Sequence, residues 1–123
     1  MNRDKMNRVP VVYVAGPFRA PTAWGIEQNV RRAEEVGAQL AQAGFFPLIP
    51  HANTRFFQGI APDALWLQGT QQLLRMCDAV TMVSGWTSSE GSMAELKLAQ
   101  SLQIPVVYAG LGSFLEELRA LLQ

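Results

Sequence analysis

The sequence predicts an α/β domain built on a parallel sheet, with helices on both faces. Short β-branched runs alternate along the chain with longer segments of helical periodicity. Hairpin turn signals are missing between these runs. Strand–helix alternation of this kind is typical of parallel sheets with right-handed crossovers. The 123 residues suit one domain, which we expect over residues 9–123, after a flexible, polar N-terminus over residues 1–8.

The first half of the chain predicts two strands around one long helix. The run VPVVYVA is β-branched and stops at Gly16, as a buried strand followed by a turn would. Ile26, Val30 and Leu40 then recur on one face of a helical pattern, and Gly44 follows as a candidate C-cap. A second apolar run ends at a proline, and the segment after it has no clear period. We expect a strand over 9–15, a helix over 24–43, a strand over 45–49 and a loop over 51–61.

The second half continues the alternation. Pro62 suits the first turn of a helix, where its missing N–H costs nothing. The apolar run AVTMVS is followed by a polar turn and then by a new helical segment. Ser113 and Glu116 have the spacing of a capping box. The expected elements are a helix over 62–76, a strand over 79–84, a turn over 85–89, a helix over 90–102, a strand over 105–108 and a helix over 113–122.

Composition excludes several classes of protein. Hydrophobic residues make up 49% and charged residues 16%, which excludes a disordered chain. Ten basic residues balance ten acidic ones, so there is no electrostatic footprint for a nucleic acid polymer or a membrane surface. No apolar run approaches transmembrane length, and no apolar signal core begins the chain. One cysteine and one histidine do not make a disulfide or a cluster of metal ligands. We expect a cytoplasmic protein.

Parallel sheets of this kind bind ligands beyond the carboxyl ends of their strands. The segment after the third predicted strand, GWTSSEGSMAE, combines small residues and hydroxyls with a helix start. Free N–H groups there favour anions, Gly91 would allow close approach, and Ser89 and Ser92 could add donors. Ordinary capping is the alternative, with Ser89 as N-cap and Ser92–Glu95 as a capping box. Trp86 lines either a pocket or an interface.

Glu95 is the candidate catalytic residue. It falls one turn into that helix, close to the strand ends and partly against apolar neighbours. Partial desolvation would raise its pKa, and nearby hydrogen-bond donors would oppose the rise. A carboxylate so placed can attack an anomeric carbon and form a covalent glycosyl-enzyme. A capping or solvated surface carboxylate is the alternative.

The segments after the first two strands hold further candidate ligand contacts. Gly16 permits close approach, Phe18 offers a stacking face for a base, and Arg19 could pair with a phosphate. A turn with a core phenylalanine and a solvated arginine explains the same residues. His51 and Asn53 follow the second strand, where a ligand contact is conceivable for both.

The motifs VYVAGPF, CDAV and GWTSSEGSMAELKLA give the chain a family resemblance. In this order they resemble the nucleoside 2-deoxyribosyltransferase-like superfamily, and within it a small bacterial and phage branch of unknown function. The resemblance implies a flavodoxin-like (Rossmann-like) three-layer sandwich with four to five parallel strands. It also implies that Glu95 is the nucleophile, that Gly16, Pro17 and Phe18 pack around base and sugar, and that no cofactor or metal is needed.

Departures from the transferases refine the expected reaction. Ser89 stands where the transferases carry an acidic residue near the sugar 5′-hydroxyl. An acidic group would repel a 5′-phosphate, whereas a serine at a helix N-terminus would favour its binding. Nucleoside 5′-monophosphate N-glycosidases of the superfamily share this arrangement. The transferases also have a proton-transferring acid near the position of Gly69, which is missing here unless Asp63 or another group substitutes, and a tail longer than one ending at Gln123. We therefore expect cleavage or transfer at the N-glycosidic bond of a (deoxy)nucleoside or its 5′-monophosphate, with hydrolysis favoured over 2-deoxyribosyl transfer.

A non-catalytic module that binds a nucleotide or ADP-ribose is the second hypothesis, because that acid is replaced. Family members are commonly dimers or higher oligomers, so the resemblance implies a homo-oligomer. Phe56, Phe57 and Trp66 are the candidate contact residues, although core packing within one subunit explains them equally well.

Overall fold

A computed structural model describes residues 8–122, and four strands within them form one all-parallel sheet. The spatial order of the strands is β2-β1-β3-β4, so the direction of strand addition reverses between β1 and β3. All four predicted strands are confirmed, each slightly shorter than expected. They are β1 (Val11–Ala15), β2 (Phe46–Leu48), β3 (Ala79–Met82) and β4 (Val106–Tyr108).

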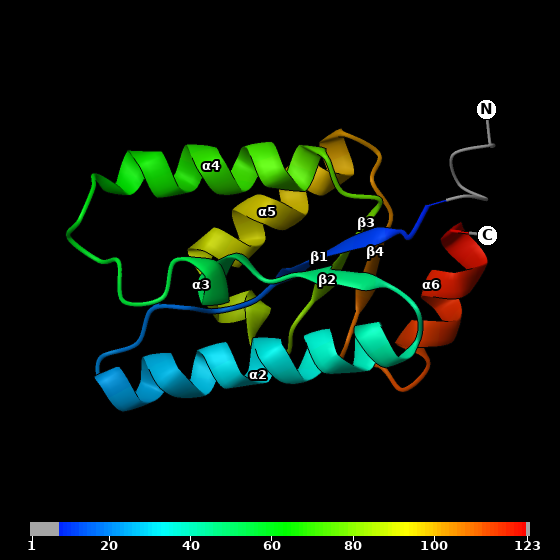
Figure 1. The fold of residues 1–123 in the computed structure, drawn as a ribbon, viewed down its shortest axis with the longest axis horizontal. Coiled ribbons are helices and arrows are strands. Elements are labelled where there is room, and N and C mark those ends of the chain that lie inside the picture. Colours follow the sequence, from blue (N-terminus) through cyan, green and yellow to red (C-terminus); the bar gives the residue numbers. More distant parts are fainter. Residues whose placement is uncertain (1–7, 123) are drawn as a thin grey trace.

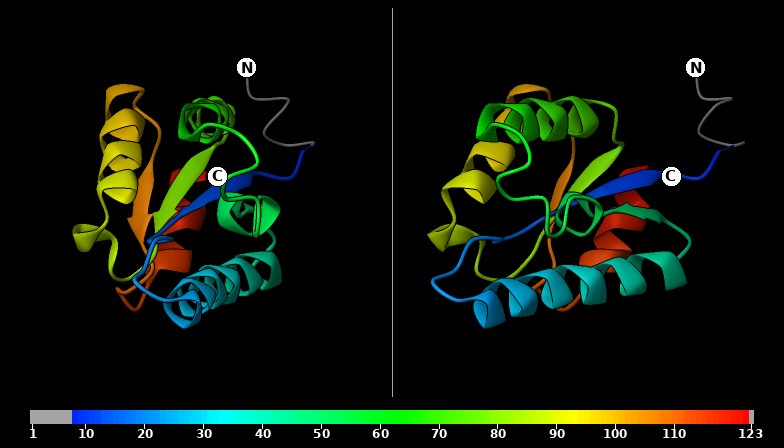
Figure 2. Two further views of the ribbon diagram at one scale, coloured as in Figure 1. Left: turned by 90° about the vertical axis from the view of Figure 1, so that its left-hand side faces the viewer. Right: turned by 60° about the vertical axis from the view of Figure 1, so that its left-hand side comes forward.

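Helices cover both faces of the sheet and complete the flavodoxin-like three-layer sandwich (Figure 1, Figure 2). On one face lie α2 (Ala23–Gln42) and α6 (Phe114–Leu122), and on the other lie α4 (Asp63–Arg75) and α5 (Glu90–Ser101). These four helices are the predicted ones, and their ends fall within one residue of the expected positions. Amphipathic periodicity therefore located them well.

Two segments expected to be irregular contain short helices. Residues 51–61 are not a loop throughout, because α3 (Pro50–Asn53) follows β2 directly. Pro50 stands in its first turn and its carbonyl accepts the N–H of Thr54. The turn after β3 holds a 3₁₀ helix, η1 (Trp86–Ser88), which is preceded by Gly85 with a φ of +96°. One turn of helix is too short to show a period in the sequence.

The flexible N-terminus expected over residues 1–8 lies outside the described residues, except for Arg8. The guanidinium of Arg8 pairs with the carboxylate of Asp78, whose Oδ2 also accepts the N–H of Val11 at 2.7 Å. Asp78 therefore ties the start of β3 to the start of β1.

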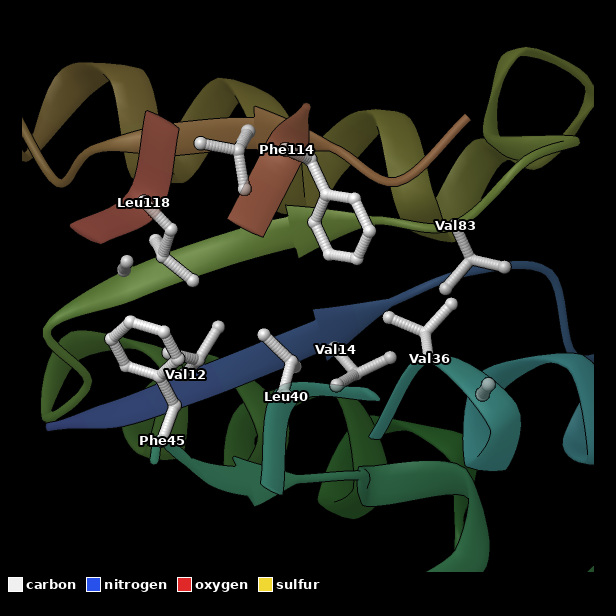
Figure 3. Close-up of a cluster of buried hydrophobic side chains, with 11 residues drawn as sticks. Val12, Val14, Val36, Leu40, Phe45, Val83, Phe114 and Leu118 are labelled. Carbon is white, nitrogen blue, oxygen red and sulfur yellow. The ribbon is translucent and has the colours of Figure 1, made fainter. Parts of the chain in front are cut away.

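Side chains alternate along β1 between two apolar cores. Val12 and Val14 face α2 and α6, where they pack with side chains from both helices (Figure 3). Tyr13 and Ala15 face α4 and α5. Tyr13 is fully buried, so the only phenol of this strand is placed in the core beneath α4 and α5. That position brings a polar hydroxyl into an apolar layer, and such a group needs a hydrogen-bond partner.

Candidate functional site: a carboxylate held by a buried tyrosine

The partner of the buried phenol is Glu95. Its Oε2 accepts a hydrogen bond from the hydroxyl of Tyr13, which lies 82 residues away in the sequence. The Glu95 side chain is half-buried, between α5 and β1. A Ser92–Glu95 capping box would bond the carboxylate to the Ser92 N–H, but that N–H donates to Ser89 Oγ instead. The carboxylate therefore bonds to a side chain of the central strand β1 and not to the amides of its own helix.

Burial changes the proton affinity of both partners. It raises the pKa of Glu95 from 4.5 to about 7, and the hydrogen bond from Tyr13 partly offsets this rise. Burial also raises the pKa of Tyr13 far above its usual range, helped by the negative charge of Glu95 and opposed by the hydroxyl of Thr70 on α4. Tyr13 therefore stays a protonated donor, while Glu95 exchanges its proton near neutrality. Perturbed carboxylates of this kind are typical of functional sites.

The start of α5 offers hydroxyls and open backbone. Ser89 is the N-cap, as the capping alternative predicted, and its Oγ accepts the Ser92 N–H at 3.1 Å. The space in front of Gly91 is open, because a Cβ there would meet nothing closer than Ser89 Oγ at 4.0 Å. Ser92 is fully buried, and its Oγ has no hydrogen-bond partner among the described residues. An unpartnered buried hydroxyl costs on the order of 1–3 kcal/mol, and the hydroxyl of Thr81 in β3 is in the same situation.

The loop after β1 is held by two side chains from other elements. His51 on α3 donates from Nε2 to the carbonyl of Gly16 at 2.9 Å, and its ring lies 4.8 Å from that of Phe18. Asn29 on α2 donates from Nδ2 to the carbonyls of Phe18 and Arg19, at 3.0 and 3.4 Å. Burial lowers the pKa of His51, and the hydrogen bond to Gly16 opposes this shift. In this arrangement His51 favours its uncharged form and holds the loop in place through its hydrogen bond and its ring contact.

Replacing His51 should separate its hydrogen bond from its packing. Leucine at position 51 would leave the Gly16 carbonyl without its donor, whereas glutamine can place an amide N–H near the position of Nε2. We expect His51→Leu to be less stable than His51→Gln by about 1 kcal/mol, the net value of one hydrogen bond. Chemical denaturation of both variants at pH 8 measures this difference. Equal stabilities would show that the hydrogen bond does not hold the loop.

The loops after β1 and β3 pack directly on each other. A Cβ on Gly16 would lie 2.8 Å from the Cβ of Val83, and one on Gly85 would lie 3.4 Å from the ring of Pro17. Gly16 is buried, so its lack of a side chain serves the contact between the two strand ends. The structure gives Gly16 and Pro17 a packing role at the point where the strand order reverses.

Arg19 and Asn53 lie at the surface. Arg19 pairs with Asp63, at the start of α4, with an Nη2–Oδ2 distance of 3.2 Å, and both side chains are more than four-fifths exposed. Exposed ion pairs contribute little to stability, so Arg19 can exchange Asp63 for another anion at small cost. Asn53 is the exposed last residue of α3.

A separate hollow of about 300 Å³ opens at the carboxyl ends of β3 and β4. The half-buried ring of Trp86 lines it together with the ring of Tyr108, and the ring centroids lie 5.6 Å apart. Trp86 therefore lines a pocket, which is one of the two roles predicted for it. Glu95 is not among the residues that line this hollow, which are Met82, Ser84, Trp86, Tyr108, Gly110 and Leu111.

Sequence reasoning missed Tyr13 and Asn29, and both left a signal. Tyr13 is the one polar side chain in the otherwise aliphatic run VVYVA, where a phenol needs a partner. Asn29 falls on the apolar face of its helix, one turn from Ile26 and from Ala33. A polar residue at a core position predicts a specific hydrogen bond, although not to which group.

Comparisons with known proteins support the fold and identify a family. Among residues 8–122 no three His, Cys, Asp or Glu side chains group as a metal site, and no helix combines the length and apolarity needed to cross a membrane. The structure is similar to that of a conserved protein from Enterococcus faecalis V583, with a TM-score of 0.66 and 19% identity. The alignment covers 82% of this chain and 63% of that protein. No curated protein matches the chain. Residues 10–108 match the family described as "Domain of unknown function (DUF4406)", and because this span runs from the start of β1 to the end of β4, the chain belongs to that family.

Proposed function

We propose that the protein cleaves the N-glycosidic bond of a (deoxy)nucleoside 5′-monophosphate with Glu95 as the nucleophile. The observation that carries the proposal is the half-buried Glu95 carboxylate, held by the hydroxyl of Tyr13 and titrating near neutrality. The motif resemblance to the nucleoside 2-deoxyribosyltransferase-like superfamily points to the same carboxylate. Hydrolysis is favoured over transfer of the sugar to a second base.

The reaction proceeds in two displacements. Tyr13 donates a hydrogen bond to Oε2 of Glu95, so Oε1 is the atom that attacks C1′ of the sugar. The C1′–N bond breaks as the new bond forms, and its electron pair leaves with the base. The base then takes a proton from solvent. A water oxygen then attacks C1′, Glu95 departs as a carboxylate, and the water loses a proton to solvent. The net reaction consumes one water and yields free base and sugar 5-phosphate. With a pKa near 7, about half of the Glu95 carboxyl groups are ionised at neutral pH, and the ionised form is more basic than an ordinary glutamate.

The start of α5 supports a phosphorylated substrate. Amide groups in the first turn of a helix precede its first internal hydrogen bond and favour anions. Gly91 leaves this turn open, and Ser89 supplies a hydroxyl beside it. The hydroxyl of Ser92 is buried and unpartnered among the described residues. Phe18, on the loop after β1 that His51 and Asn29 hold, is the proposed flanking residue for base and sugar. Trp86, in η1, lines the hollow at the carboxyl ends of β3 and β4, which Glu95 does not line.

Charge at position 89 should control the choice between nucleotide and nucleoside. Aspartate and asparagine both cap helices as well as serine does, so both variants keep the helix start. We expect Ser89→Asp to raise KM for a 5′-monophosphate by about tenfold or more through charge repulsion, since a close like-charge contact costs more than about 1.4 kcal/mol. KM for the nucleoside should change little, and Ser89→Asn should leave both values near wild type. Steady-state kinetics with both substrates measure the effect, and an equal change for nucleotide and nucleoside would place the phosphate elsewhere.

Base release is the direct test of the activity. The protein is incubated with a panel of deoxynucleoside 5′-monophosphates and nucleosides, and free base is quantified by chromatography. Wild type should release base from at least one member, and Glu95→Gln should not. A second base added in excess should lower the yield of free sugar phosphate only if transfer competes. If wild type is inert while a nucleotide still raises its melting temperature, the non-catalytic nucleotide-binding hypothesis replaces this one.

We also propose that the protein forms a homo-oligomer, as the resemblance implies. Phe56 is 77% exposed and Phe57 is 43% exposed, and Phe57 packs on the half-buried Trp66 with ring centroids 6.1 Å apart. Apolar side chains gathered on a surface in this way favour association. Light scattering that gives the mass of one chain would contradict the proposal.

A further inference from the structure

We propose that the hollow at the carboxyl ends of β3 and β4 is a separate binding site for a planar heteroaromatic ring of nucleobase size. Its volume of about 300 Å³ is ample for one such ring and falls at the lower end of small-molecule sites, roughly 300–1,000 Å³. The Glu95 carboxylate does not line it. The proposal therefore concerns a second site, and it does not require Glu95 to be catalytic.

Two aromatic side chains give the hollow its preference for flat ligands. Trp86 and Tyr108 pack with ring centroids 5.6 Å apart and planes tilted by 42°. Both are half-buried, so each ring keeps part of its surface available. Leu111 adds an exposed apolar side chain to the lining. Planar rings stack on such surfaces, whereas saturated ligands gain only apolar burial.

A hydroxyl at the hollow favours a ring with polar edge atoms. Ser84 is exposed and lines the hollow opposite Gly110. A Cβ on Gly110 would approach Ser84 Oγ to 2.9 Å, so the glycine leaves room for this hydroxyl. Ring nitrogens and exocyclic groups of a base can accept from or donate to it. Apolar walls with one polar group that fixes orientation are typical of small-molecule sites.

The lining is carried by rigid elements. Met82 and Tyr108 are register partners in the β3–β4 ladder, and the N–H of Ala109 donates to the Met82 carbonyl at 2.9 Å. Trp86 belongs to η1, whose entry is fixed by the positive φ of Gly85. A site on paired strand ends is largely formed before a ligand arrives, which lowers the entropic cost of binding.

Tryptophan fluorescence tests the site directly. Replacing Trp24 and Trp66 by phenylalanine leaves Trp86 as the reporter of the three tryptophans. Free adenine and free thymine are the probes, because they carry no glycosidic bond and cannot be turned over. Saturable quenching by at least one base is expected, and cyclohexanol should have no saturable effect. Absence of saturable quenching up to the solubility limit of both bases, or equal binding of cyclohexanol, would overturn the proposal.

A matched pair of glycine variants locates the binding. Gly110→Val places a branched side chain in the hollow, whereas Gly112→Val lies two residues further along and its Cβ would meet nothing within 4 Å. Gly110→Val should abolish the quenching and Gly112→Val should preserve it, with circular dichroism confirming both folds. Tyr108→Leu should weaken base binding by about 5- to 100-fold, the range that one base–aromatic stack accounts for. Unchanged binding in Gly110→Val or in Tyr108→Leu would refute this location.

Discussion

Glu95→Gln should yield a protein that releases no base and is nevertheless more stable than the wild type at pH 8. Glutamine has the shape of the protonated carboxyl group and can still accept the hydrogen bond from Tyr13 through its amide oxygen. It cannot carry the negative charge that burial disfavours, and it is not a nucleophile toward C1′. We expect the rate of base release to fall by at least about a thousandfold, since removing a nucleophile has effects of this scale or larger.

The gain in stability should depend on pH. Because the folded-state pKa of Glu95 is raised, the folded protein binds this proton more tightly than the unfolded chain. The associated stability is complete below pH 4.5 and is lost as pH rises through about 7. At about 1.4 kcal/mol per pKa unit, the shift from 4.5 to about 7 corresponds to roughly 3–4 kcal/mol. Glu95→Gln should therefore melt up to about 10 °C above wild type at pH 8 and close to it at pH 5.

Scanning calorimetry at the two pH values measures this difference. Glu90→Gln is the matched control, because Glu90 lies in the first turn of the same helix and is exposed. It removes a favourable charge from the helix N-terminus and should cost a few tenths of a kcal/mol, with no gain at pH 8. A Glu95→Gln protein whose stability relative to wild type is the same at both pH values would show that the carboxylate is not desolvated.

Tyr13→Phe should move the pH dependence of catalysis to higher pH. In the wild type, kcat/KM should rise with pH through about 7, because the nucleophile must be ionised. The hydrogen bond from Tyr13 lowers the pKa of Glu95, so its loss should raise that pKa further. A hydrogen bond to a charged group is worth about 1.5–3 kcal/mol, so the rate at pH 7 should fall by about 10- to 100-fold. A pH–rate profile of base release measures both effects.

Tyr108→Phe is the control for this variant. It removes the hydroxyl of the second tyrosine of the chain, which packs on Trp86, and keeps its ring. The midpoint of its pH–rate profile should match that of the wild type. Recovery of the Tyr13→Phe rate at high pH would show that Tyr13 acts by favouring the ionised form of Glu95. A Tyr13→Phe profile that overlays the wild-type profile would remove Tyr13 from the mechanism.

The fold could be predicted from the sequence because its elements repeat a local pattern. Twenty residues of α2 show one apolar face, and the β-branched run of β1 ends at a glycine and a proline. Strand–helix alternation then restricts the topology to parallel arrangements. The one-turn helix α3 has no period to detect, so it was missed, and the same holds for η1 within its polar turn. The match to a solved structure with a TM-score of 0.66 supports the overall architecture.

The site could be predicted only in part, because its key contact is not local. Glu95 was singled out from its place on the helix after the third strand. Tyr13 was assigned to the first strand without a role, since the contact depends on how α5 crosses β1. The contacts of His51 could not be predicted either. Its position after β2 predicts a ligand contact, which stays a prediction, and the structure adds a hydrogen bond to the Gly16 carbonyl and a ring contact with Phe18. Such contacts depend on the distances between elements.

The titration of Glu95 tests the central claim most directly. Selective ¹³C labelling of glutamate carboxyl groups, with Glu95→Gln to assign the signal, follows this one group by NMR from pH 3 to pH 9. The account predicts a midpoint near 7, well above the ordinary 4.5 of a glutamate, and a further rise in Tyr13→Phe. A midpoint near 4.5 would show a solvated carboxylate and would contradict the buried, tyrosine-held nucleophile.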